Sequence, residues 1–307
     1  MAGAGLMAAS GTGTQDRRSR SSRDWDNGKN WNWNINTRTN GGEVSSCSDI
    51  EATTKRGEIA RDEEVQNVAA SAQMLNVTAH QNGPLSISGA DRNDYQVTLC
   101  KFAVADTADE ARTKLTQLSL VVENGRVGVK GPVDNGYLAY LLVETPREAH
   151  LSAQTLNGPL SLRSVSGKIR ARTTNGPMSV SQVSGDIDVE ATNGPVSLNE
   201  CGGHMRVVTQ NGPLSVNLSG SDWQGSGLDA STQNGPLHLN VPENYRSGVL
   251  VDITGSGPFS CSNSACRNAQ RDWNNDSRRL IFGSDPNPIV RLTTGNGPVS
   301  IGSGKDN

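Results

Sequence analysis

Large side chains are scarce in this sequence. Only 34% of its 307 residues are hydrophobic, and only 4% are aromatic. That supply is too small for a thick globular core, and it favours a thin core shared among many turns. The 34 glycines suit a chain that turns often.

The chain also lacks the features that mark several common functions. Its net charge of −3 and pI near 5.8 give no general reason to bind nucleic acid or an anionic membrane. No run approaches the roughly 18 apolar residues that a membrane span needs. No glycine-rich phosphate loop precedes a helical pattern, and the four histidines are not in ligand spacing with the cysteines. We therefore expect no nucleic acid partner, no membrane span, no metal and no cofactor.

What the sequence does contain is a repeat. The motif Asn-Gly-Pro-x-Ser occurs four times at a spacing of 18 residues, and further copies lie on both sides. A fixed period of this length is typical of a solenoid, in which each repeat buries its apolar face only by stacking on its neighbours. The motif asparagines are Asn82, Asn157, Asn175, Asn193, Asn211, Asn234 and Asn296, and Ser256-Gly257-Pro258 is a near-copy.

Each repeat has an internal alternation of apolar residues. From Leu160 to Ala171 the apolar positions are spaced by two, with one change of phase near Ser166-Gly167, and the next coils keep the same offsets. This pattern predicts two short strands with one face inward, separated by a corner. Parallel stacking would place equivalent asparagines about 4.8 Å apart, close enough for ladders of side-chain amides.

We interpret the Asn-Gly pair as the second corner, since both residues tolerate positive φ and the following proline can begin a strand. On this interpretation the motif residues are structural rather than ligand-binding. The predicted corner residues are Asn82, Asn157, Gly158, Asn175, Gly176, Asn193, Gly194, Asn211, Gly212, Asn234, Gly235, Asn296 and Gly297.

These patterns predict an all-β fold: a single-stack parallel β-helix (β-solenoid) with coils of 18 residues. One short helix is expected over Ala105–Leu118, near the N-terminal end. The predicted divisions are a low-complexity, disordered leader over 1–45, a solenoid domain over 46–307, regular coils over 157–233, and loop insertions near 219–227 and 260–287.

Outward positions of the coils carry a second regularity. In a parallel stack, Arg170, Asp188, Arg206 and Asp229 would form a ladder of alternating charge. Exposed pairs of this kind contribute only about 0.2–1 kcal/mol each, but like charges in a slipped register would repel. We interpret the ladder as register control, with a ligand groove as the alternative.

Three carboxylates on one strand face, Asp186, Asp188 and Glu190, leave an enzymatic alternative open. Such a row could hold Ca²⁺ weakly or act in polysaccharide cleavage. The predicted neighbours Arg170 and Arg206 favour neutralised pairs over a metal site or an acid with a raised pKa.

Tryptophans and cysteines supply the remaining candidates. Aromatic rings can stack on sugar rings, so possible ligand contacts are Trp31, Trp33, Trp223 and Trp273. The alternative for Trp31 and Trp33 is a first strand that covers the open end of the core, because the ends of a solenoid need caps.

Two of the five cysteines, Cys261 and Cys266, lie close together in the sequence and could close a small disulfide loop in an oxidising compartment. Cys201 occupies a core position of the repeat and is expected to be a buried thiol.

A longer stretch carries a resemblance to a known family. A strand, a short helix and a Leu-x-Leu-x-Val run precede VETPREAHLSAQTLNGPLSLRSVSGKIRARTTNGPMSV. This order, with its tandem Thr-x-Asn-Gly-Pro-x-Ser motif, resembles the bacterial putative-adhesin family, a β-solenoid domain of unknown function, over roughly 75–302. The resemblance implies a parallel β-helix in an exported or envelope-associated protein of the periplasm or cell surface. It brings no catalytic residues.

We therefore expect a non-enzymatic surface or envelope scaffold used for adhesion or protein contact. A glycan-binding module is the second hypothesis. A polysaccharide-active enzyme and end-to-end self-association through exposed strand edges are further ones. Met1–Ala9 lacks a basic segment before its apolar residues, so the chain shows no clear signal peptide.

Overall fold

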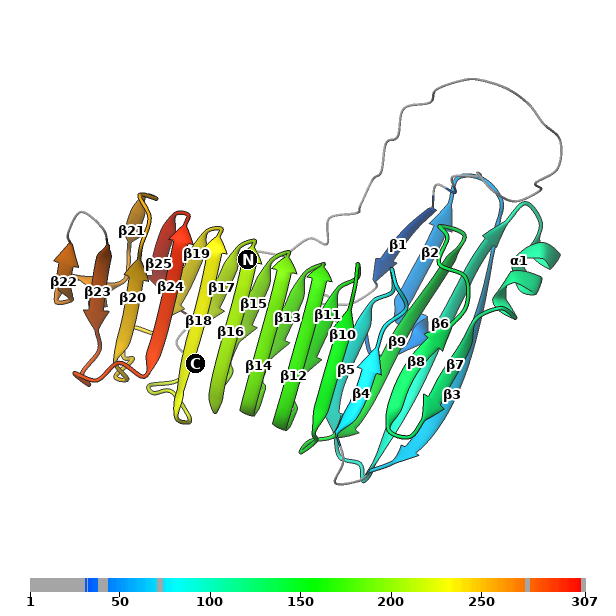
Figure 1. Cartoon of the computed structure of the whole chain (residues 1–307), viewed down its shortest axis with the longest axis horizontal. Helices are drawn as coiled ribbons and strands as arrows, with labels where there is room; N and C mark the ends of the chain where they lie inside the picture. The colour runs from blue at the N-terminus through cyan, green and yellow to red at the C-terminus, as the bar shows by residue number, and fades with distance from the viewer. Residues whose placement is uncertain (1–30, 32, 38–43, 71–73, 274–276, 305–307) are drawn as a thin grey trace, which may run out of the picture.

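The computed structural model describes residues 31, 33–37, 44–70, 74–273 and 277–304, which form an elongated body (Figure 1). This part of the chain is all-β with one α-helix, and its strands form a 12-stranded, an 11-stranded and a two-stranded sheet. No helix in these ranges is long and apolar enough to cross a membrane.

The two large sheets lie face to face and enclose the core between them. In spatial order, the 12-stranded sheet contains β22 (Gln270–Trp273), β23 (Arg278–Phe282), β20 (Val249–Ile253), β24 (Val290–Asn296), β18 (Gly227–Asn234), β16 (His204–Asn211), β14 (Ser184–Asn193), β12 (Ser166–Asn175), β10 (Leu151–Thr155), β4 (Leu75–Thr78), β8 (Arg126–Lys130) and β7 (Ser119–Glu123). The 11-stranded sheet contains β21 (Phe259–Cys261), β25 (Val299–Ser303), β19 (Leu237–Val241), β17 (Leu214–Asn217), β15 (Val196–Asn199), β13 (Met178–Ser181), β11 (Leu160–Arg163), β5 (Leu85–Ala90), β9 (Tyr137–Pro146), β6 (Asp94–Ala105) and β3 (Glu58–Ala69).

The middle of both sheets is parallel and in register with the sequence repeat. Leu160 pairs with Met178, and Met178 pairs with Val196, so that each apolar residue lies over its equivalent in the next coil. The inward residues of these coils are buried, apart from Cys201, which is partly exposed. Burial of each such aliphatic side chain contributes about 1.5–3 kcal/mol, which a lone coil could not gain.

The N-terminal end is antiparallel. β6 pairs antiparallel with both β3 and β9, and β7 and β8 form an antiparallel hairpin. The helix α1 (Ala108–Leu115) follows β6; it is shorter than predicted, and a capping box between Thr107 and Glu110 begins it. The expectation of one parallel stack over 46–307 is therefore wrong here, because long antiparallel strands occupy residues 58–105 and 119–146.

A third layer covers this end. β1 (Trp33–Thr37) pairs antiparallel with β2 (Ile50–Thr54), and Trp33 and Ile35 pack on a cluster that includes Phe102 and Tyr140. The predicted disordered leader over 1–45 is thus wrong for Trp33–Thr37; residues 1–30 lie outside the described part. The strand forms because its alternating apolar side chains find the outer face of β6 and β9.

The C-terminal end contains a change of strand order. β24 lies between β18 and β20, and β25 lies between β19 and β21, so the last coil of the chain fills the position after β18–β19. Val249 pairs with Val290 but Phe259 pairs with Val299, so β20–β21 contains one residue more than β24–β25 and accommodates it as a bulge.

The insertion predicted near 260–287 is not simply a loop. After β21, the 3₁₀ turn η2 (Ser264–Arg267) crosses the end of the core, and β22 and β23 pair antiparallel with each other and extend the 12-stranded sheet past β20. The insertion near 219–227 does form a loop between β17 and β18. Parallel coils therefore occupy the middle of the molecule, and antiparallel strands lie at both ends.

Candidate functional site

Asparagine side chains form a continuous ladder along one edge of the stack. Each motif asparagine donates its Nδ2–H to the Oδ1 of the preceding one in space, with N–O distances of 2.9–3.0 Å. The ladder runs Asn82, Asn157, Asn175, Asn193, Asn211, Asn234, Asn296. It uses the amides for contacts between coils, which leaves little of their hydrogen-bonding capacity for a ligand.

The glycines beside this ladder allow the coils to approach. A Cβ added at Gly194 would lie 2.2 Å from the carbonyl oxygen of Gly176, and one at Gly176 would lie 2.4 Å from that of Gly158. Gly194 also has φ of +145°. Gly212, Gly235 and Gly297 face their neighbours in the same way. These residues are therefore corners of the backbone.

A second amide ladder joins Asn199, Asn217 and Asn240 on the outer face of the 11-stranded sheet. Sequence reasoning missed it. The signal was present, because Asn199 and Asn217 stand six residues after motif asparagines at the regular spacing of 18, and Asn240 stands at the same offset after Asn234.

The outer face of the 12-stranded sheet carries the charged residues. Register aligns Arg170 with Asp188, Asp188 with Arg206, and Arg206 with Asp229, and adds Arg291 next to Asp229. Asp188 lies 3.0 Å from Arg206. The predicted ladder is therefore aligned in the backbone.

Its side-chain contacts differ from the prediction. Within the described residues, neither Arg170 nor Asp229 has an ion pair within 4.0 Å. Arg172 takes the place of Arg170, at 3.9 Å from Asp188 and 3.0 Å from Glu190. The long arginine side chains reach diagonally rather than straight along the stack.

The row Asp186, Asp188, Glu190 is neutralised. Lys168 lies 3.8 Å from Asp186, and Arg206 lies 3.0 Å from Asp188 and 3.1 Å from Glu190. Burial alone would raise the pKa of Glu190, but hydrogen bonds and charge from Arg172 and Arg206 outweigh it and hold that pKa below its usual value. A general acid needs the opposite shift. Among the described residues, no three His, Cys, Asp or Glu side chains are grouped so that they could share a metal ion.

The four candidate tryptophans lie in three different places. Trp33 donates its Nε1–H to the carbonyl of Asn135 at 3.0 Å, and Lys114 lies 5.7 Å from the centre of the Trp31 ring. Both therefore belong to the N-terminal layer. Trp223 is only 7% exposed and donates to the carbonyl of Gly203, so the suggestion that it contacts a ligand is wrong.

Trp273 is different. It is 51% exposed at the C-terminal end, where it packs edge-on against Phe259 with ring centres 5.9 Å apart. The guanidinium of Arg271 lies 5.7 Å from the centre of its ring. This is the one candidate ring of the four with an open surface.

The structure contains two disulfides, one at each end. Cys261–Cys266 joins β21 to η2, and Cys47–Cys100 joins the outer N-terminal layer to β6. Sequence reasoning suggested the first and missed the second, since Cys47 and Cys100 are 53 residues apart and their strands meet only in the folded chain. Cys201 is a free thiol whose pKa is raised by burial.

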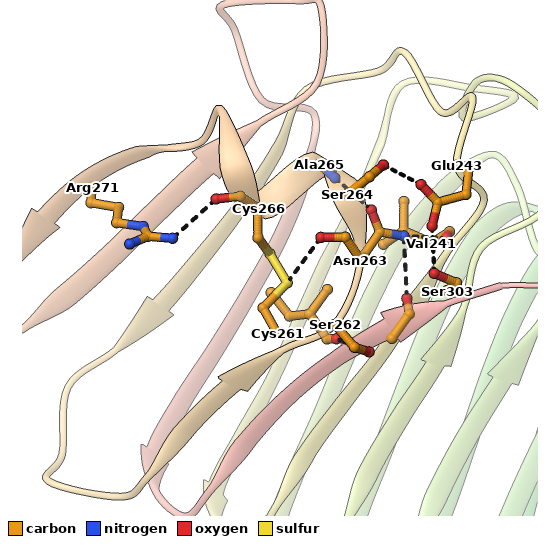
Figure 2. The surroundings of a disulfide bond; sticks show 12 residues. Val241, Glu243, Cys261, Ser262, Asn263, Ser264, Ala265, Cys266, Arg271 and Ser303 are labelled. Atoms are coloured by element: carbon orange, nitrogen blue, oxygen red, sulfur yellow. Dashed lines mark hydrogen bonds between the residues drawn. A yellow bond between two sulfur atoms is a disulfide. The ribbon is translucent and has the colours of Figure 1, made fainter.

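Polar contacts fasten the C-terminal disulfide loop to the coils beneath it (Figure 2). Asn263 is 3% exposed and donates its Nδ2–H to the carbonyl of Val241 at 2.8 Å. Glu243 accepts hydrogen bonds from Ser264 and Ser303. Arg271 donates to the carbonyl of Cys266 at 3.0 Å. The loop is thus an integral cap of the stack.

Comparison with known proteins yields only weak likeness. No family model matches the chain, and no curated protein matches it. A putative cell adhesion protein from Clostridium sporogenes is 13% identical with a TM-score of 0.30, covering 80% of this chain and 100% of its own. A putative adhesin from Bacteroides fragilis is 11% identical with a TM-score of 0.26, covering 78% and 97%. A putative lipid binding protein from Parabacteroides distasonis is 9% identical with a TM-score of 0.22, covering 78% and 96%. Likenesses of this size do not place the chain in a family.

Proposed function

We propose that the chain is a non-enzymatic β-solenoid scaffold that acts in adhesion or protein contact outside the cytoplasm. The observation that carries the proposal is the unbroken amide ladder from Asn82 to Asn296. It locks successive coils into one register, so the two outer faces form fixed, repetitive surfaces on an elongated body. Such surfaces suit contact with a partner better than they suit turnover of a small substrate.

The state of the carboxylates supports a role without catalysis. Every member of the acidic row has a cationic neighbour, and the pKa of Glu190 is lowered, not raised. A glycosidase needs one carboxyl group that keeps its proton near neutral pH beside one that does not. The paired row has no such asymmetry.

Both disulfides support a location in an oxidising environment. Disulfides persist in secreted, periplasmic and surface proteins and are rare where thiols are kept reduced. Cys47–Cys100 and Cys261–Cys266 each close an end of the stack. Alkylation of the protein isolated from its host without reductant, followed by mass spectrometry, tests this: we expect label on Cys201 alone, whereas label on all five cysteines would contradict an exported protein.

Adhesion and turnover can be tested together. Beads coated with the folded full chain are passed over surfaces bearing immobilised polysaccharides or host proteins, with beads coated with the heat-denatured chain as control. Release of reducing ends is measured on the same polysaccharides. We expect retention on at least one surface without release of sugar. Release that disappears in Asp188→Asn or Glu190→Gln would replace the scaffold with an enzyme.

A further inference from the structure

We propose that the C-terminal end of the stack binds acidic glycans, through the ring of Trp273 and the guanidinium of Arg271. The inference rests on the proposed adhesive function and assigns to it a site and a class of ligand. It begins with the way the two large sheets end.

The 12-stranded sheet extends further than its partner at this end. β23 and β22 continue it past β20, whereas β21 is the last strand of the 11-stranded sheet (Figure 1). The inner face of the β22–β23 hairpin therefore has no sheet opposite it. The segment after Cys261 fills part of that space, and Cys266, Leu280 and Phe282 are buried there with Ala265 and Ala269 against them.

Register places Trp273 and Arg271 on this inner face. Arg271 pairs with the buried Leu280, and Trp273 pairs with Arg278. Residues directly opposite in an antiparallel pair point to the same side, as do residues two apart on one strand. Asp272 therefore points to the other side, together with its partner Arg279.

The inner face of the hairpin carries positive charge without acid. Residues 262–282 contain four arginines and two aspartates, in a chain whose net charge is −3. Arg279 pairs with Asp252 at 3.1 Å, and Arg278 donates to the carbonyls of Gly255 and Gly257. Arg271 is exposed and directs one donor to the carbonyl of Cys266, as Figure 2 shows, and its guanidinium has further N–H groups.

An exposed indole beside an arginine fits one ligand chemistry better than others. The open half of the Trp273 ring can stack on the C–H face of a sugar, and a guanidinium binds a carboxylate through two parallel hydrogen bonds. A uronic acid presents both groups on one ring. A neutral sugar would use only the indole, and a lone anion only the arginine.

The test titrates the folded full chain with an alginate hexasaccharide, and with maltohexaose as a neutral chain of equal length. Binding is read by calorimetry and by tryptophan fluorescence. We expect the uronate to bind and to quench fluorescence, and the neutral chain to bind about tenfold more weakly because it lacks the carboxylates. Equal binding of both, or of neither, would overturn the site.

Variants separate the ring from the charge. We expect Trp273→Ala and Arg271→Gln each to lower the uronate affinity about tenfold, and Arg271→Lys to lose less because it keeps the charge but not the planar fork. Trp273→Phe retains a ring and guards against a folding defect. Arg279→Gln is the matched control, because it removes a cation from the opposite face of the same hairpin; we expect less than a twofold change.

Other polyanions provide the remaining outcomes. If a single-stranded oligonucleotide or anionic lipid vesicles displace the hexasaccharide at lower concentration, the site is a general anion surface and the proposal fails. If the uronate does not bind while coated beads still adhere elsewhere, this site fails and the adhesive function stands. If the beads adhere to nothing and the uronate binds, the glycan site survives without the wider function.

Discussion

In the middle of the molecule each strand has parallel neighbours on both sides, whereas at either end the chain turns to antiparallel strands and a disulfide. The middle repeats one solution: an inward aliphatic residue, a glycine corner and an asparagine that binds its copies above and below. The ends cannot use that solution, because the last coil has no further copy to bind. They are closed by different residues that occur once.

The comparison explains where covalent links occur. A coil in the middle is held by two neighbours, and the end strands by one, so opening of the structure is expected to begin at the ends. Cys47–Cys100 and Cys261–Cys266 lie there, and Cys201 in the middle is unpaired. The caps also leave only short strand edges at the C-terminal end, which argues against unlimited end-to-end polymerisation.

The largest effect should come from the N-terminal disulfide. Replacing Cys47 and Cys100 by serine frees a loop of 53 residues, and the loop-entropy relation gives a loss of about 4 kcal/mol in the free energy of unfolding of that end. The same change at Cys261 and Cys266 closes a separation of only 5 and should cost about 2 kcal/mol. Urea unfolding of both variants measures the difference; equal losses would show that the two ends do not differ as described.

A glycine corner in the middle should be nearly as sensitive. Gly194→Ala would place a Cβ 2.2 Å from the carbonyl oxygen of Gly176, so two coils must separate, and we expect a loss on the order of 3 kcal/mol. Gly220→Ala is the control, since Gly220 also has positive φ but has nothing within 4 Å. It should lose only about 1 kcal/mol. Similar losses in both would mean that close approach of the coils is not what requires glycine.

A single rung of the amide ladder should matter less. Asn193→Ala removes one hydrogen bond to Asn175 and one from Asn211, and we expect a loss of about 1–2 kcal/mol. Asn296→Ala, at the end of the ladder, removes its bond to Asn234 and should lose about half as much. The comparison of unfolding midpoints tests whether the ladder stabilises by counted contacts; a larger loss at Asn296 would contradict it.

The smallest effect concerns pH. The pKa of Glu190 is lower in the folded chain than in the unfolded one, so its pairing stabilises above the unfolded value near 4.5 and is lost as pH falls through the folded value. Glu190 is 40% exposed, which limits the contribution to about 0.5 kcal/mol. Glu190→Gln should therefore lower stability slightly at pH 7 and not at pH 3. A loss of equal size at both values would show that charge is not responsible.

The middle of the fold could be predicted from the sequence because its interactions repeat. The spacing of 18 residues identified the inward residues Leu160, Met178 and Val196 and the motif asparagines, each of which meets its own copy. The antiparallel strands β3, β6 and β9 could not be predicted, because their pairing joins dissimilar segments that occur once.

The position of β24–β25 had a sequence signal that went unused. Asn296 belongs to the full motif, whereas Ser256 replaces the asparagine in the near-copy. An amide ladder continues from Asn234 to Asn296 and has no place for Ser256 between them. The residue that ends a ladder thus marks the outer coil, even when it comes earlier in the chain. Of the candidate site, the sequence pointed to Trp273 but could not separate it from Trp223, since exposure depends on how the strands end.

The most direct test is hydrogen exchange of the full chain, measured by mass spectrometry before and after mild reduction. The account predicts that reduction raises exchange in residues 47–54, 94–105 and 259–273, while residues 157–217 keep their protection. Exchange that rises equally along the chain, or first in the parallel middle, would contradict the conclusion that repeated contacts hold the middle and disulfides hold the ends.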